Sequence, residues 1–146
     1  MDDAYGVQRC HAITGEMTTL ARLRLQPGVN RLASRILPEP LAAFPIVAAT
    51  GTDDGRWSAI VAWTVHTLVS AERPETSWYP GGAGAMPIAA PELGLDKDWQ
   101  RNVIGAVGNY GDIFERNLGK GSPLKLERGL NANQLHGGLL LSPFLD

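Results

Sequence analysis

The stretch that decides the fold runs from Asp96 to Gly129 and reads DKDWQRNVIGAVGNYGDIFERNLGKGSPLKLERG. Its apolar residues recur every three or four positions, which places them on one face of a helix. They are Trp99, Val103, Ala106, Val107, Tyr110, Phe114 and Leu118. Asp96 is a suitable N-cap, and Gly119 follows the last apolar residue, where a C-cap favours glycine. The pattern therefore predicts one amphipathic helix between these two residues.

Three glycines lie inside this predicted helix, and a second helix is expected after it. Each glycine destabilises a helix by roughly 1 kcal/mol relative to alanine, so we expect a neighbouring element to approach closely there. The three are Gly105, Gly108 and Gly111. Ser122 and Pro123 are typical of an N-cap and a first helical residue. They predict a short helix that ends near Gly129.

The N-terminal part of the chain alternates short helices with short extended segments. Its predicted helices are the end of one over Asp2–Gln8 and another over Thr18–Leu25, in which Arg22 and Arg24 point outward. The composition predicts a buried strand over Cys10–Thr14 and extended segments over Arg35–Leu37 and Phe44–Ala49. Strands near residues 10 and 44, with helices between and after them, predict an α/β fold.

A further helix and a long loop follow. Asp53 or Asp54 is the expected N-cap of a helix that ends before Pro74. Its apolar face comprises Trp57, Ile60, Val61, Thr64, Val65, Leu68 and Val69. Residues 74–94 are rich in proline and glycine and show no period, so they predict a loop. Trp78 and Tyr79 would mark a contact surface if exposed in that loop.

Composition argues against several classes of function. Hydrophobic residues make up 44% and charged residues 19% of the 146 residues, as in an ordinary globular domain, and the formal net charge is −2. Such a balance gives no electrostatic reason to expect a nucleic-acid or anionic-membrane partner. Basic residues gather near the C-terminal end, but Glu115 and Glu127 interrupt them, which favours a solvated helix face. They are Arg116, Lys120, Lys125 and Arg128.

The sequence holds no pattern typical of a metal, cofactor or catalytic site. Cys10 is alone, and we expect it to be buried rather than reactive. His11, His66 and His136 are widely spaced and lack the intervals of metal ligands. Neither the spacing of a phosphate-binding loop nor a nucleophile elbow is present. We therefore predict no catalytic residue, no metal and no cofactor.

Three segments resemble a known family. Residues 94–131, GLDKDWQRNVIGAVGNYGDIFERNLGKGSPLKLERGLN, closely resemble the C-terminal end of the solute-binding proteins of general L-amino-acid ABC transporters. Residues 4–25, AYGVQRCHAITGEMTTLARLRL, look like the family's helix-to-strand segment, and residues 36–72 look like its return strand and following helix. The resemblance covers most of the chain but only part of the family's length, which suggests a truncated relative.

The resemblance implies a type II periplasmic-binding-protein fold with two lobes. Mapped onto this chain, residues 1–40 would be a remnant of the second lobe, 41–50 a hinge-like strand and 51–146 the C-terminal helices of the first lobe. Each lobe would lack its main sheet, which would leave strand edges and apolar faces uncovered. We therefore expect a helix-rich, partial α/β fold that is completed by dimerisation or by exchange of a strand or domain.

Glu16 is the one residue onto which the resemblance carries a ligand contact. The family has an Asp at this place, and its carboxylate meets the ligand's α-ammonium group through charge-assisted hydrogen bonds. This chain has Glu16 preceded by Gly15, so its carboxylate is one methylene further from the backbone. An ordinary exposed acid is the alternative interpretation of the same residue. The family's other pocket residues have no counterpart in this sequence.

The resemblance implies binding of L-amino acids or small polar ligands without chemistry, next to the membrane subunits of an ABC transporter. The alternative is a structural or interaction module that self-associates or contacts transporter components and binds no ligand. Catalysis with Glu16 as a base is the least favoured hypothesis. The family is periplasmic, whereas the chain begins MDDAYG, without the basic and apolar regions of a signal peptide, so the cytoplasm stays open.

Overall fold

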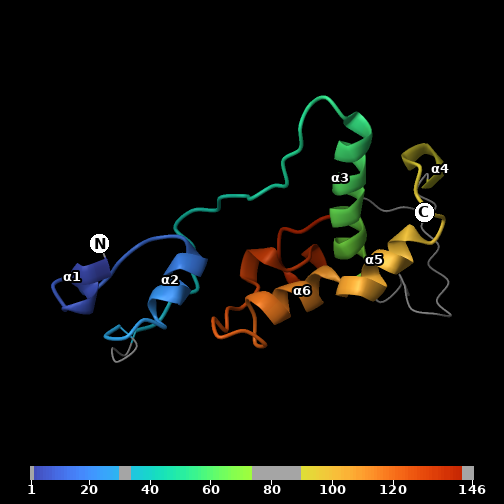
Figure 1. Ribbon diagram of the computed structural model, residues 1–146. Coiled ribbons are helices and arrows are strands. Elements are labelled where there is room, and N and C mark those ends of the chain that lie inside the picture. The colour runs from blue at the N-terminus through green and yellow to red at the C-terminus, as the bar shows by residue number, and fades with distance from the viewer. Residues whose placement is uncertain (1, 30–33, 74–89, 143–146) are drawn as a thin grey trace. The chain divides into compact units, whose positions relative to one another are not determined.

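The computed structural model describes residues 2–29, 34–73 and 90–142 (Figure 1). In that part of the chain the regular elements are all helical. They are α1 (Asp2–Gly6), α2 (Met17–Leu23), α3 (Gly55–Ser70), α4 (Ala90–Leu93), α5 (Trp99–Val107), α6 (Tyr110–Asn117), and the 3-10 helices η1 (Gly129–Asn131) and η2 (Gln134–His136). The predicted helices at residues 2–8, 18–25 and after 54 are thus confirmed as α1, α2 and α3.

The predicted strands are wrong for the described residues. Cys10–Thr14, Arg35–Leu37 and Phe44–Ala49 form no strand there, and the bridge described is an isolated one between Asn133 and Leu140. A strand requires hydrogen bonds to a neighbouring strand, and an extended local preference does not supply that neighbour. The helical part of the predicted α/β class is therefore confirmed, and its β part does not appear in the described residues.

The chain divides into two compact units. The first contains Met1–Ala43 and Glu115–Glu127, and the second contains Phe44–Phe114 and Arg128–Asp146. The chain thus leaves the first unit, builds most of the second, and returns to the first within α6. This division does not test the assignment of residues 1–40, 41–50 and 51–146 to lobes and a hinge, which stays a prediction.

The first unit has a small apolar core. Ala21 and Leu23 of α2 are buried, as are Val29 and Leu126. Arg22 and Arg24 are exposed, as expected, and Leu23 between them faces inward. Ala21 and Leu23 are the buried residues of α2, so a small contact area holds this helix.

The second unit is organised around α3. Asp54 caps this helix by accepting a hydrogen bond from the backbone N–H of Trp57 at 2.8 Å, as predicted. The helix packs against α4 and α5, where Leu93 and Trp99 form a buried cluster (Figure 1). Partly buried residues surround the cluster: Ala59, Ile60, Trp63, Leu95 and Val103. Trp57 was expected on the apolar face, but its side chain is 54% exposed because it lies in the first turn, before the packed part of α3.

The single long helix predicted from the apolar stripe is two helices. α5 begins at Trp99, with Asp98 rather than Asp96 at the N-cap position, and it ends at Val107, with Gly108 as its C-cap at a φ of 80°. Asn109 and Asp112 then start α6 by accepting hydrogen bonds from each other's backbone N–H at 2.9 and 3.0 Å. In this reciprocal cap, side-chain oxygens accept from N–H groups that would donate to backbone carbonyls in a continuous helix. The break lies where periodicity alone predicts continuity.

The second predicted helix, over residues 122–129, is also absent. The Ser122 hydroxyl accepts a hydrogen bond from the Leu124 N–H at 3.2 Å, which closes a local turn instead of a helical one. Lys125 then has φ of 49°, a left-handed conformation that ends any right-handed helix. The Leu126 N–H donates to the Leu118 carbonyl at 2.9 Å and returns the chain toward α6.

The predicted loop over residues 74–94 lies mostly outside the described residues, as do Trp78 and Tyr79, and its last residues form α4. Among the helices that the structure describes, none is long and apolar enough to cross a membrane.

Candidate functional site

Glu16 lies at the N-cap position of α2, with an extended backbone (φ −62°, ψ 136°). Its carbonyl accepts the Leu20 N–H at 2.9 Å, which begins the helical hydrogen bonds. Its carboxylate makes no hydrogen bond to the helix backbone. It accepts instead from two hydroxyls, those of Thr18 and Thr19, the latter at 3.3 Å. The side chain is therefore oriented by its neighbours and remains exposed.

The Glu16 carboxylate retains capacity for a further donor. An ionised carboxylate offers about four lone-pair directions, and the two threonine hydroxyls occupy one on each oxygen. An ammonium group, which carries three donors, can reach the remaining directions from solvent. The arrangement is chemically suited to holding a small cationic group. Glu16 is exposed, so a cationic group bound to it would remain partly hydrated.

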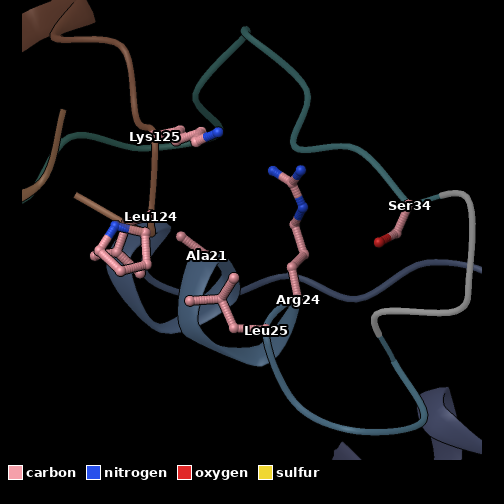
Figure 2. A pocket seen from close by; sticks show the side chains of 7 residues that line it. Ala21, Arg24, Leu25, Ser34, Leu124 and Lys125 are labelled. Carbon is pink, nitrogen blue, oxygen red and sulfur yellow. The ribbon is translucent and has the colours of Figure 1, made fainter. Parts of the chain in front are cut away.

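A pocket of about 300 Å³ lies in the first unit, at the opposite end of α2 (Figure 2). Its lining consists of Ala21, Arg24, Leu25, Ser34, Pro123, Leu124 and Lys125. Glu16 is not among these residues. Because eight residues separate Glu16 from Arg24, the two lie about 12 Å apart along the helix at about 1.5 Å per residue. The pocket and the Glu16 carboxylate are therefore separate features of the same unit.

Lys125 enters this pocket from a constrained backbone. Its φ of 49° is rare for a residue with a side chain, and a left-handed conformation costs about 1–2 kcal/mol per residue. Hydrogen bonds of Leu124 to Ser122 and of Leu126 to Leu118 hold the backbone on both sides. The expected solvated helix face does not exist at this position, because no helix forms there.

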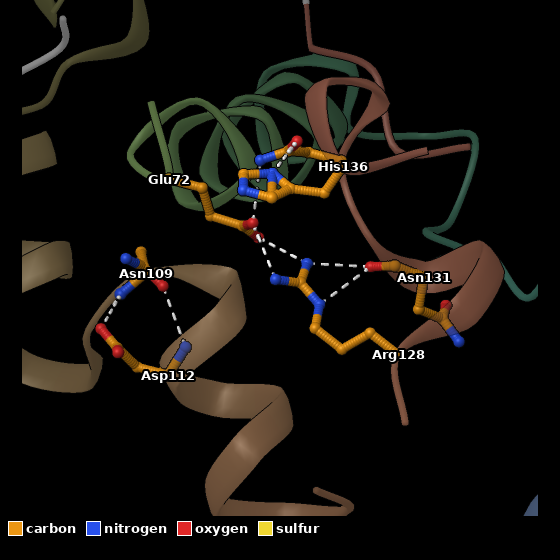
Figure 3. A network of polar contacts seen from close by, with 7 residues as sticks. Glu72, Asn109, Asp112, Arg128, Asn131 and His136 are labelled. Carbon is orange, nitrogen blue, oxygen red and sulfur yellow. Dashed lines mark hydrogen bonds and ion pairs between the residues drawn. The ribbon is translucent and has the colours of Figure 1, made fainter. Parts of the chain in front are cut away.

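The second unit contains a polar network centred on Arg128 and Glu72 (Figure 3). The guanidinium donates to both carboxylate oxygens, at 2.7 and 2.8 Å, and the Arg128 and Glu72 side chains are 19% and 7% exposed. Arg128 also donates to the Asn131 carbonyl and lies over the rings of Tyr110 and Phe114. Asn133 donates to Glu72 at 3.1 Å. The sequence-based expectation of a solvated Arg128 is therefore wrong.

This network has a structural role. It joins the end of α3 to the C-terminal segment. Both of its charged side chains, Arg128 and Glu72, have hydrogen-bond partners inside the protein. His136, the only histidine of the network, contacts the Asn133 side-chain oxygen at 3.0 Å. Within the described residues no three His, Cys, Asp or Glu side chains gather in a way that could hold a metal ion. Cys10, expected in a buried strand, is half-buried in a segment without one.

Known proteins similar in sequence to this chain include amino-acid-binding proteins of bacteria. The chain is 38% identical over 156 residues to the general L-amino acid-binding periplasmic protein AapJ of Rhizobium johnstonii, a match over 96% of this chain and 45% of that protein. It is 33% identical to the glutamate/glutamine/aspartate/asparagine-binding protein BztA of Rhodobacter capsulatus, over 97% of this chain and 47% of BztA. The chain is related to the periplasmic binding proteins of amino-acid ABC transporters. No family model matches it.

A solved structure supports the same relationship. An ABC transporter periplasmic binding protein from Brucella ovis, with glutathione bound, is 37% identical to the chain and superposes with a TM-score of 0.70. The match covers 95% of this chain and 48% of that protein. The chain therefore spans less than half the length of the relatives it matches, as the sequence predicted. The matched part of the chain is therefore similar in fold to about half of a periplasmic binding protein.

The sequence led to Glu16 as a candidate, which stays a prediction, and did not indicate the pocket at the other end of α2. Arg24 was correctly expected to lie on the outside of its helix, yet nothing local indicated what it would face. Lys125 was assigned to a helix that does not form. The turn-forming hydroxyl of Ser122 was the available signal, because serine competes with helical hydrogen bonds as readily as it caps a helix.

Proposed function

We propose that the chain is an amino-acid-binding module of the solute-receptor type, which binds L-amino acids without chemistry. Glu16 would accept the ligand's α-ammonium group. The observation that carries this proposal is the exposed, threonine-oriented carboxylate of Glu16, at the place where the family has its ligand-binding Asp. AapJ, a general L-amino acid-binding protein, and BztA, which binds glutamate, glutamine, aspartate and asparagine, support the ligand class.

Glu16 alone is insufficient for useful affinity. An exposed ammonium–carboxylate pair contributes about 0–1 kcal/mol, whereas a dissociation constant of 1 μM requires about 8 kcal/mol. The ligand's own carboxylate and side chain need further partners. We propose that a second copy of the chain supplies them, so that the binding-competent form is a homo-oligomer. As with its relatives, the partners in the cell would be ABC-transporter membrane subunits, and the compartment the periplasm.

A thermal-shift panel of the twenty amino acids tests this function. A ligand at 100 times its dissociation constant adds about 2.7 kcal/mol of stability, which is a shift of several degrees for a domain of this size. At least one amino acid is expected to produce a saturable shift, with a mass by light scattering that corresponds to more than one chain. No shift from any amino acid would contradict the proposal and favour an interaction module.

Three variants then locate the site. Glu16→Gln keeps the shape and removes the charge, so it should weaken binding of the active amino acid by up to about fivefold, the equivalent of about 1 kcal/mol. Glu16→Asp restores the family's residue and should bind at least as tightly as the native chain. Glu39→Gln removes another exposed acid of the first unit and should have no effect. Equal affinity in Glu16→Gln and Glu39→Gln would overturn the assignment of Glu16.

A further inference from the structure

The pocket at the C-terminal end of α2 combines two cations with no acid. Arg24 is the residue that directly follows α2, and Lys125 lies in the turn that follows α6. Figure 2 shows their charged ends extending toward the same space, which Ser34 also borders. No carboxylate belongs to the described lining of this pocket. Within the described part of the chain, neither cation forms a side-chain hydrogen bond or an ion pair.

The backbone presents Lys125 to the pocket in a defined way. The φ of 49° at Lys125 is left-handed, so the chain turns here instead of continuing as a right-handed helix. The backbone hydrogen bonds of Leu124 and Leu126 on either side hold this conformation. Non-glycine residues in this region are uncommon and concentrate at sites where a ligand is held. Lys125 therefore reaches the pocket from a backbone that is less free than that of an ordinary surface lysine.

We propose that this pocket binds a small, multiply charged oxyanion between Arg24 and Lys125, with Ser34 as an additional donor. Two like charges directed at one space favour an anion with at least two charged oxygens, because each cation donates a charge-assisted hydrogen bond. The volume of about 300 Å³ is at the lower limit of ligand pockets, which fits a small anion with a few waters. The site is distinct from Glu16, which lies at the other end of α2.

Calorimetric titration of the native chain with inorganic phosphate tests the proposal. Sulfate and succinate serve as parallel titrants, which distinguish a tetrahedral oxyanion from a dicarboxylate, and sodium chloride at equal ionic strength is the blank. Saturable binding is expected for at least one of the three, weakening as salt is added. Absence of saturable binding by all three anions would overturn the proposal.

Matched variants locate the anion. Arg24→Gln and Lys125→Asn should each weaken binding about tenfold or more, and asparagine accepts the left-handed backbone at position 125. Arg22→Gln on α2 and Lys120→Asn remove exposed cations that do not line the pocket, so they should leave binding unchanged. Unchanged affinity in both pocket variants, or equal losses in all four, would contradict the assignment.

A measurement on the native chain covers the case in which a variant fails to fold. The bound anion should protect the Lys125 amine from acetylation, measured by mass spectrometry of digested protein, while Lys120 reacts at an unchanged rate. Equal acetylation of Lys125 with and without the anion would overturn the proposal without any substitution.

Discussion

The two units of the chain differ in what they bury. In the second unit, α3 packs against α5, Trp99 and Leu93 form a buried cluster there, and the Arg128–Glu72 pair fixes the C-terminal segment to the end of α3. In the first unit the buried apolar side chains are aliphatic, as in Leu23 and Leu126, and no aromatic side chain is buried among its described residues, while Leu41 is 86% exposed. The candidate ligand contacts, in contrast, all lie in the first unit. Packing and recognition are therefore carried by different parts of the molecule.

The largest expected effect is the loss of the aromatic anchor of the second unit. Trp99→Ala should lower the free energy of unfolding by about 3–5 kcal/mol, because it removes a buried side chain against α3. Leu41→Ala, in the first unit, should change it by less than about 0.5 kcal/mol. Denaturant titration followed by circular dichroism measures both. A comparable loss in Leu41→Ala would mean that Leu41 is covered in solution and would break the contrast between the units.

The next effect compares two ion pairs among the described residues of the second unit, one partly buried and one exposed. Arg128→Ala leaves the buried Glu72 carboxylate with Asn133 as its remaining partner, so the loss should be about 3 kcal/mol, at the lower end for a broken buried pair. Arg101→Ala breaks the pair with Asp98, whose side chains are 65% and 42% exposed, and should cost at most about 1 kcal/mol. Equal losses in the two variants, from the same titration, would show that the Arg128 network does not anchor the C-terminal segment.

The smallest expected effect is at two glycines of the Asp96–Gly129 stretch, where substitution by alanine should change the free energy of unfolding in opposite directions. Gly108→Ala should destabilise by about 1–2 kcal/mol, because φ is 80° and an added Cβ would lie 2.7 Å from an Asp112 oxygen. Gly105→Ala, inside α5 with open space around its Cα, should stabilise by about 0.5–1 kcal/mol. Thermal melts measure both. Stabilisation by both substitutions would indicate that α5 and α6 form one continuous helix.

Helices with local signals were predictable from the sequence, and contacts between distant segments were not. Asp54 caps α3 because its side chain and the Trp57 N–H are three residues apart. The break at Gly108 depends on a choice between helix continuation and the Asn109–Asp112 cap, which periodicity does not resolve. Close approach was expected at all three interior glycines, but only at Gly111 does a distant side chain, that of Arg128, lie within 3 Å of a Cβ position.

The candidate site shows the same difference between local signals, which the sequence reveals, and contacts between distant segments, which it does not. Glu16 became a candidate through the family resemblance alone, after a predicted strand that does not form in the described residues. The pocket of Arg24 and Lys125 required residues 24 and 125 to meet, 101 positions apart in the sequence. The Glu72–Arg128 pair escaped prediction for the same reason, since alternating charges around Arg128 are equally typical of a solvated surface.

The most direct test of this division of roles is hydrogen exchange measured by mass spectrometry, with and without the amino acid that gives the largest thermal shift. In the free protein, amides of α3 and α5 should exchange most slowly and those of α2 faster, because few apolar contacts hold α2. Adding the amino acid should slow exchange around residues 16–20 and leave α3 unchanged. Protection of α2 equal to that of α3 in the free protein, or ligand protection confined to α3 and α5, would contradict the account.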